Sequence, residues 1–308
     1  MARAGVAASR GPASTVTSDR VTTPRVTVTM PPLDVVRPGR AVEHPTCRTS
    51  WILSFPVAHH IRSAGDVAYA RVAVTATDHD PAVPPASRTI RTFHPRRGRM
   101  SDRQTDALSR LWPAYGLDVP DGPVVPVDLA ALFGRRAPVV LEIGSGMGDS
   151  TAAMATADPD RDYLAVEVHT PGIANLLDLV ERGGLRNVRV AQGDALSLVS
   201  GLPEGVLDAV HVFFPDPWPK SRHHKRRLIQ PAHVALLRSR LRSGGMLHCA
   251  TDWAEYADAM RETLDADPEL VDAYGGFAPR PAHRPVTKFE RRAIRAGRPV
   301  ADLLYRRR

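Results

Sequence analysis

Five short apolar runs follow residue 137, and each ends at or near a glycine or an acidic residue. They cover 137–143, 162–168, 187–191, 207–214 and 246–250. Helical periodicity separates them, over 149–157, 173–181, 231–241 and onward from 253. Continuous apolar strands joined by short helices are typical of a parallel, doubly wound α/β sheet. We therefore expect such a sheet, with a last strand over 300–305 and with Gly244 and Gly245 ending the third helix.

Acidic side chains recur where these runs end. Ligands of open α/β sheets bind at the carboxyl ends of the strands, so this edge should hold the chemistry. Helix capping explains one or two acidic residues at such places but accounts poorly for all five. The residues are Glu142, Glu167, Asp194, Asp216 and Asp252.

The first run leads into a glycine loop with the spacing G-x-G-x-G, formed by Gly144, Gly146 and Gly148. Glu142 and Asp149 flank it, and their charge would repel the pyrophosphate of a dinucleotide. They suit a ligand with a cationic end, such as the sulfonium and ammonium groups of S-adenosylmethionine. A dehydrogenase is the alternative at this point.

Two further carboxylates are placed to bind the nucleoside of such a ligand. Glu167 ends the second strand, where a carboxylate accepts hydrogen bonds from both ribose hydroxyls. Asp194 follows the third strand and is placed to meet an adenine amino group. With Glu142, these residues make S-adenosylmethionine the expected cofactor.

The region before the predicted sheet differs in composition. Residues 1–87 contain ten prolines and are rich in Ala, Thr, Ser, Val and Arg. Such a segment buries too little apolar surface to offset its ordering entropy, so we expect a mostly disordered extension, with a short strand or transient contact within 51–61. Its arginine-bearing start also resembles a transit peptide, a less favoured interpretation. The folded domain is expected over 88–308.

That domain begins with a basic arm that holds seven arginines between residues 88 and 116. The arm runs into a helical pattern with Leu108, Leu111 and Trp112 on one face and a cap at Ser101 or Asp102. Contact with a phosphate backbone and a solvated arm that covers the domain edge are equally compatible with this segment.

Charge and cysteine content narrow the function classes. The 308 residues include 41 Lys and Arg against 33 Asp and Glu, a net charge of +8 that favours polyanionic partners such as nucleic acid. Cys47 and Cys249 are the two cysteines, too few for a disulfide scaffold or a cysteine-based zinc site. No apolar run approaches the length of a membrane helix. We expect no bound metal and no membrane association.

The most distinctive segment, VFFPDPWPKSRHHKRRLIQ, follows the fourth strand. Five cations lie within eight residues and should bind phosphates: Lys220, Arg222, Lys225, Arg226 and Arg227. Phe214 and Trp218 offer faces for stacking on an extruded base. At the end of a strand, Phe214 is favoured as a core residue. Trp218, between two prolines, is expected to contact the substrate or cofactor pocket.

Taken together, LEIGSGMG, AVEVHTPG, FFPDPWPKSRHHKRR, ATDW and RPVTKFERR occur here in an order and spacing that resembles the bacterial tRNA (guanine-N7-)-methyltransferases of the TrmB type. The resemblance covers residues 88–308, with a small departure at Pro219. It implies a Rossmann-like, mostly parallel sheet of the class I S-adenosylmethionine-dependent methyltransferase type. It also implies transfer of a methyl group to guanine 46 in the variable loop of tRNA.

The same resemblance assigns roles to individual residues. Glu142, Glu167, Asp194 and Asp216 match the cofactor residues of the family, and Asp216 also matches its proposed catalytic residue. Matches to its substrate-binding residues are Lys220, Asp252 and a loop over the pocket comprising Thr287, Lys288, Phe289 and Glu290.

Two other function classes remain open from the sequence. One is a non-catalytic RNA-binding protein, and the other is a methyltransferase acting on another RNA, a protein or a small molecule. We favour the tRNA methyltransferase, and we expect a cytoplasmic protein, with a monomer favoured.

Overall fold

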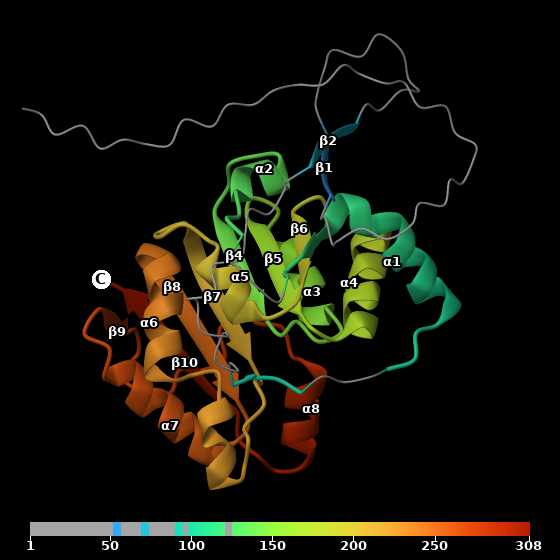
Figure 1. Cartoon of the computed structure of the whole chain (residues 1–308). Coiled ribbons are helices and arrows are strands. Elements are labelled where there is room, and N and C mark those ends of the chain that lie inside the picture. The colour runs from blue at the N-terminus through green and yellow to red at the C-terminus, as the bar shows by residue number, and fades with distance from the viewer. Residues whose placement is uncertain (1–51, 57–68, 74–89, 95–97, 121–124) are drawn as a thin grey trace, which may run out of the picture. The chain divides into compact units, whose positions relative to one another are not determined.

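The computed structural model describes residues 52–56, 69–73, 90–94, 98–120 and 125–308 (Figure 1). Most of the segment predicted to be disordered, 1–87, lies outside these ranges. Within it, β1 (Ile52–Pro56) pairs antiparallel with β2 (Tyr69–Ala73), so the strand expected within 51–61 is present. The remainder of the described chain forms a separate unit that contains the predicted sheet.

The sheet of this second unit has eight strands in the order β3-β6-β5-β4-β7-β8-β10-β9. All neighbours from β3 to β8 pair in parallel, and β10 pairs antiparallel with β8 and β9. The fold is therefore the expected Rossmann-like, doubly wound and mostly parallel sheet. The strands are β3 (Gly116–Asp118), β4 (Val139–Ile143), β5 (Asp162–Glu167), β6 (Val188–Gln192), β7 (Leu207–Phe213), β8 (Leu241–Thr251), β9 (Leu270–Asp272) and β10 (Ala301–Arg307).

The strand order reverses at β4. The chain builds outward from β4 through β5 to β6, and then returns to the other side of β4 with β7 and β8. A crevice opens at such a reversal because the connections leave it in opposite directions, and ligands bind there.

Helices cover both faces of this sheet (Figure 1). One apolar core lies between the sheet and α1, α3 and α4, and the other between the sheet and α2, α5, α6 and α7. None of the helices in the described ranges combines the length and hydrophobicity that crossing a bilayer requires. The helices are α1 (Asp102–Tyr115), α2 (Leu129–Phe133), α3 (Asp149–Ala157), α4 (Thr170–Gly183), α5 (Ala195–Ser200), α6 (Pro231–Arg240), α7 (Ala254–Asp265) and α8 (Lys288–Arg295).

One predicted boundary was wrong. The glycine pair at 244–245 does not end α6, which stops at Arg240; β8 begins at Leu241 and passes through both glycines. Gly244 takes a φ of +74°, and the pairing of β8 with β7 shifts register between Leu207 and Ala209. The glycines thus form an irregularity inside a strand rather than a helix cap.

The helix of the basic arm has the predicted cap and the predicted apolar face. Ser101 caps α1 reciprocally with Gln104, whose side chain accepts a hydrogen bond from the Ser101 N–H at 3.0 Å. Leu108, Leu111 and Trp112 pack against the core under α4. On the rim, Arg103 makes a bidentate pair with Asp178 of α4. At least part of the arm therefore covers the domain, as one of the two interpretations predicted.

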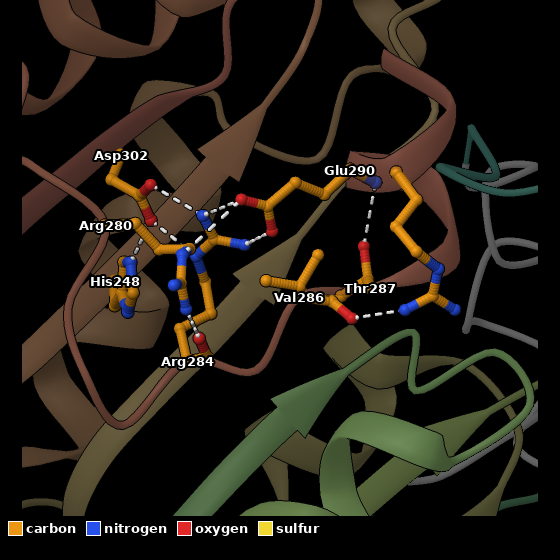
Figure 2. A network of polar contacts seen from close by, with 8 residues as sticks. His248, Arg280, Arg284, Val286, Thr287, Glu290 and Asp302 are labelled. Carbon is orange, nitrogen blue, oxygen red and sulfur yellow. Dashed lines mark hydrogen bonds and ion pairs between the residues drawn. The ribbon is translucent and has the colours of Figure 1, made fainter. Parts of the chain in front are cut away.

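A buried ion network attaches α8 to the sheet (Figure 2). Arg284, which is 0% exposed, donates to both oxygens of Asp302 on β10 at 2.7 and 2.8 Å. The same guanidinium donates to Glu290 of α8 at 2.6 and 3.4 Å. Burial alone would raise the pKa of Asp302, but hydrogen bonds from His248 and Arg284 hold that pKa below its ordinary value.

Close backbone packing joins α4 to the glycine loop. A Cβ atom placed on Gly172 would lie 1.9 Å from the Gly146 carbonyl oxygen. No side chain therefore fits at this position unless the helix and the loop separate.

Gly172→Ala should lower the free energy of unfolding by about 2 kcal/mol or more, because the added methyl group meets main-chain atoms rather than a movable side chain. Gly183→Ala, at the exposed end of the same helix, is the matched control. It meets only the Leu185 side chain at 3.1 Å and should be neutral or slightly stabilising. Urea unfolding of both variants measures the difference; equal stabilities would contradict the packing argument.

Arg284→Met should lower the free energy of unfolding by about 3–5 kcal/mol, because it leaves two buried carboxylates without their cation. Arg292→Met, on the exposed side of α8, should change it by less than about 0.5 kcal/mol. Urea titrations near pH 7 measure both variants, and a loss for Arg284→Met no greater than for Arg292→Met would refute the network's role.

Candidate functional site

A cavity of about 230 Å³ lies at the carboxyl ends of the central strands. It sits at the reversal of strand order, where a ligand is expected. The loops that follow four strands contribute to its wall: Gly144 and Gly146 after β4, Val168 and His169 after β5, Gly193 and Ala195 after β6, and Phe214 to Asp216 after β7. The predicted glycine loop and two of the predicted carboxylates, Glu167 and Asp216, therefore meet in one pocket.

The glycine loop adopts a backbone that other residues rarely take. Gly144, Gly146 and Gly148 have φ values of +77°, +60° and +80°. At the first two positions a Cβ would meet open space, whereas at Gly148 it would lie 2.5 Å from the Leu176 Cβ of α4. The first two glycines leave room beside the pocket, and the third lets α3 start against α4.

Glu167 is held by main-chain donors. Its Oε2 accepts from the Gly146 N–H at 2.8 Å, and its Oε1 accepts from Val168 and His169 N–H groups at 2.6 and 2.9 Å. A carboxylate has about four lone-pair directions, so capacity remains for a hydroxyl donor from a ligand. The arrangement fixes the carboxylate at the pocket wall without neutralising its charge with a cation.

Glu142 lies beneath the loop rather than at the cavity wall. It is 3% exposed on β4, and the Thr151 hydroxyl of α3 donates to it. Burial raises the pKa of Glu142 to about 7, and the nearby charge of Glu167 acts in the same direction. This carboxyl links the strand to the helix that the glycine loop opens.

Asp194 and Asp252 make contacts with the protein itself. Asp194 caps α5 and accepts from the Leu196 N–H at 2.8 Å, while its neighbours Gly193 and Ala195 line the cavity. Asp252 does not cap α7; it pairs with Arg298, which donates at 2.7 and 3.0 Å. Helix capping, the alternative to a ligand role, therefore holds for Asp194 and not for Asp252, and the predicted ligand roles of both residues stay predictions.

Of the two aromatic predictions in the distinctive segment, the one for Phe214 was met in part and the one for Trp218 was wrong. Phe214 is half-buried and packs against the core under α4, but it also lines the cavity and lies 6.2 Å from the Phe289 ring. Trp218, expected at the pocket, is 4% exposed and contacts the His94 ring and the Arg226 guanidinium. Their φ values of +52° and +47° are strained for large side chains. This backbone turns Phe214 toward the ligand side and Trp218 into the protein.

The five predicted phosphate-binding cations separate into two groups. Lys220, Arg222 and Lys225 are exposed around the short 3-10 helix η1 (Ser221–Arg226). Arg227, in contrast, is 5% exposed, pairs with Glu255 and donates to the Pro217 carbonyl at 2.9 Å. Arg226 donates to the carbonyls of Arg91 and Phe93. The last two therefore shape the site, and only the first group offers charge to a polyanion.

Sequence reasoning missed the part of the wall formed by the basic arm. Thr92, Phe93 and His94 line the cavity. They are held there from across the site, since Trp218 Nε1 donates to the Thr92 carbonyl at 3.3 Å. No local pattern in the arm signals this contact, which depends on a residue more than 100 positions away.

The segment 287–290 is not the expected loop but the start of α8. Thr287 caps the helix and accepts from the Glu290 N–H at 3.0 Å. Lys288 and Phe289 line the cavity, whereas Glu290 is buried and pairs with Arg284, with the exposed Arg280 3.6 Å away. The ion pair with Arg284 keeps Glu290 out of the pocket, and the same orientation of α8 presents Lys288 and Phe289 to the pocket.

These residues fit S-adenosylmethionine. The pocket combines two carboxylates with apolar surface from Ile143, Val166 and Phe213, as a nucleoside with a cationic centre requires. The glycine loop exposes main chain rather than side chains to this cavity, since a Cβ at Gly144 or Gly146 would meet open space. Glu167, Gly144 and Gly146 would hold such a ligand.

Comparison with known proteins agrees with the geometry. The sequence model of a family described as putative methyltransferases matches residues 136–303. The tRNA (guanine-N(7)-)-methyltransferase of Streptomyces coelicolor is 56% identical over 231 residues, which cover 74% of this chain and 84% of the relative. The enzyme of the same name from Halorhodospira halophila is 54% identical over 224 residues, with 72% and 96% covered. The chain therefore belongs to the tRNA (guanine-N(7)-)-methyltransferase family.

Proposed function

We propose that this protein transfers a methyl group from S-adenosylmethionine to N7 of guanine 46 in the variable loop of tRNA. The observation that carries the proposal is one pocket at the carboxyl edge, with the glycine loop and Glu167 on one wall and Asp216, Phe214 and Lys288 on the others. Family membership supports the guanine-N7 chemistry. The guanine position follows from the resemblance in the motifs described above.

This reaction requires little general acid–base catalysis from the protein. Guanine N7 has a lone pair and no proton, so no strong general base is required. When bound, S-adenosylmethionine supplies an electrophilic methyl group. The protein must hold N7 in line with it, and most of the rate enhancement should come from this positioning.

Asp216 is the residue that we propose as catalytic. It lines the cavity at the end of β7, next to Phe214. Methylation places a positive charge on the guanine ring, and a carboxylate in the pocket both stabilises that charge and grips the N1/N2 edge of the base. Phe214, opposite Phe289, offers a face on which the base stacks.

The exposed cations beside the pocket are suited to the tRNA backbone. Lys220, Arg222 and Lys225 project from the segment that follows β7, and Lys288 lies at the cavity itself. Most of this positive charge lies outside the pocket, while Lys288 lies at its wall together with the carboxylates Glu167 and Asp216. The charge pattern favours a polyanion that delivers one base to the site over a small-molecule or protein acceptor. With tRNA as substrate, we propose a cytoplasmic enzyme, and we favour a monomer.

Asp216→Asn should lower the single-turnover rate about 100-fold, because the charge that forms on guanine loses its counter-charge. The measurement uses the purified full chain, labelled S-adenosylmethionine and unmodified tRNA. Cleavage at 7-methylguanine then maps the modified base, which should be guanine 46.

Asp258→Asn, on the exposed face of α7, is the matched control and should keep the wild-type rate. Full single-turnover activity in Asp216→Asn would remove Asp216 from the mechanism. Donor binding without any tRNA methylation would refute the acceptor, and cleavage at a different guanine would refute the position.

Lys220→Ala/Lys225→Ala should weaken tRNA binding and reduce the slope of log K against log salt by about 2, one for each lost phosphate contact. Arg136→Ala/Arg186→Ala removes the same charge from exposed residues at the amino ends of β4 and β6, the opposite edge of the sheet. Filter binding over a salt series compares the two variants, and equal slopes would contradict a tRNA surface beside the pocket.

A further inference from the structure

Three histidines meet on the sheet, away from the glycine loop. His211 of β7 and His248 of β8 are direct neighbours in the parallel pairing, so their side chains share one face. His283, from the segment between β9 and α8, lies against both, with ring centroids 5.5 Å from His211 and 5.2 Å from His248. Each ring offers a nitrogen, and these nitrogens all lie within 4.8 Å of one another.

The hydrogen bonds of His248 prepare one of these nitrogens for a metal. His248 Nε2 lies 2.7 Å from Asp302 Oδ1, and an ionised carboxylate only accepts, so Nε2 carries the hydrogen. The lone pair is then on Nδ1, which faces His283 Nε2 at 3.1 Å. A carboxylate that fixes the tautomer and orientation of a histidine in this way is a recurrent partner of metal-binding histidines.

His211 supplies an independent indication. It is 5% exposed, and its Nδ1 is buried with no hydrogen-bond partner in the described part of the chain. A buried polar atom left in this state is costly, and it is satisfied when a ligand occupies the space before it. His211 therefore has a nitrogen without a competing bond, and one of its two ring nitrogens lies within 4.8 Å of those of His248 and His283.

The surroundings allow an ion to enter and to remain. A cavity of about 460 Å³, distinct from the cofactor pocket, is lined by His211 and His283. Arginines among the described residues line this cavity: Arg161 is paired with Asp158 and Asp208, Arg242 is paired with Asp208, and Arg306 donates to the Gly244 carbonyl. Arg284, which follows His283 in the chain, is paired with Asp302 and Glu290.

We propose that His211, His248 and His283 form a binding site for a divalent transition-metal ion of the zinc type, with water as a further ligand. Zinc–nitrogen bonds of about 2.0–2.1 Å place tetrahedral ligand atoms about 3.3 Å apart. The 3.1 Å pair is already close to this separation, and the other two nitrogen–nitrogen distances, each at most 4.8 Å, would shorten on binding. On binding, the hydrogen of His283 moves from Nε2 to Nδ1, and no net proton is lost.

The site would act as a structural tie for the methyl-transfer pocket. His283 directly precedes Arg284, which anchors α8, and α8 presents Lys288 and Phe289 to the pocket. A metal bridging His283 to β7 and β8 would fasten this segment to the sheet. The expectation that no metal binds rested on the low cysteine count and did not consider histidines brought together from three distant segments.

The test is zinc binding by the metal-free full chain, measured by competition with a chromogenic chelator. We expect one zinc ion per chain and, at about 100-fold excess over the dissociation constant, a rise in Tm of about 5 °C or more. His283→Ala should weaken zinc binding at least about 100-fold, since losing even an outer hydrogen-bond partner of a ligand costs 10–100-fold. Because His283 is exposed, this variant should keep the metal-free Tm of the wild type.

His233→Gln is the matched control, because His233 is half-buried on α6 and lies outside the cluster. It should retain both the zinc stoichiometry and the shift in Tm. Zinc affinity that is equal in the wild type and in His283→Ala, or a wild-type Tm that zinc leaves unchanged, would overturn the proposal. Neither readout depends on methyl transfer, so failure of the proposed function would not affect the result.

Discussion

The wall of the pocket that α8 forms depends on one buried guanidinium. Arg284 holds Asp302 of β10 and Glu290 of α8 at the same time, and no part of its side chain reaches solvent. Such a network is costly to desolvate. It also tolerates few substitutions, because loss of the guanidinium would leave two buried carboxylates without the cation that they share. It therefore fixes the angle at which α8 leaves the sheet, and with it the positions of Lys288 and Phe289.

The opposite wall, formed by the glycine loop and the loop after β5, is held by main-chain hydrogen bonds instead of ion pairs. Three glycines turn the chain from β4 into α3, and the N–H groups of Gly146 and of the loop after β5 converge on Glu167. The pocket is thus bounded by a rigid backbone cradle on one side and by an ion-anchored helix on the other. A cationic nucleoside suits the cradle, and a stacked base suits the aromatic surface opposite it.

Arginine serves two purposes in the segment after β7. Arg226 and Arg227 form hydrogen bonds within the protein. Arg226 donates to carbonyls of the basic arm, and Arg227 donates to Glu255 and to the Pro217 carbonyl. The planar, multi-donor guanidinium can satisfy several acceptors at once, which a lysine cannot do. In the same segment Lys220 and Lys225 stay exposed, so the basic sequence divides into residues bound within the protein and residues exposed to solvent.

The sequence by itself determined that the strands form a mostly parallel sheet and that the ligand site lies at their carboxyl ends. It could do so because apolar runs, helical periodicity and acidic residues at strand ends are local signals. It also identified the glycine loop, Glu167 and Asp216, which local turns place at the carboxyl ends. Tertiary structure decided the rest. That Arg227 meets Glu255 and that Trp218 holds the arm depend on partners far away in the chain. Glu290 meets Arg284, which is near in the chain, because both side chains are buried together with Asp302 of β10. Burial selects among such pairings, since a charge or ring meets its partner only when the segments that carry both have packed together.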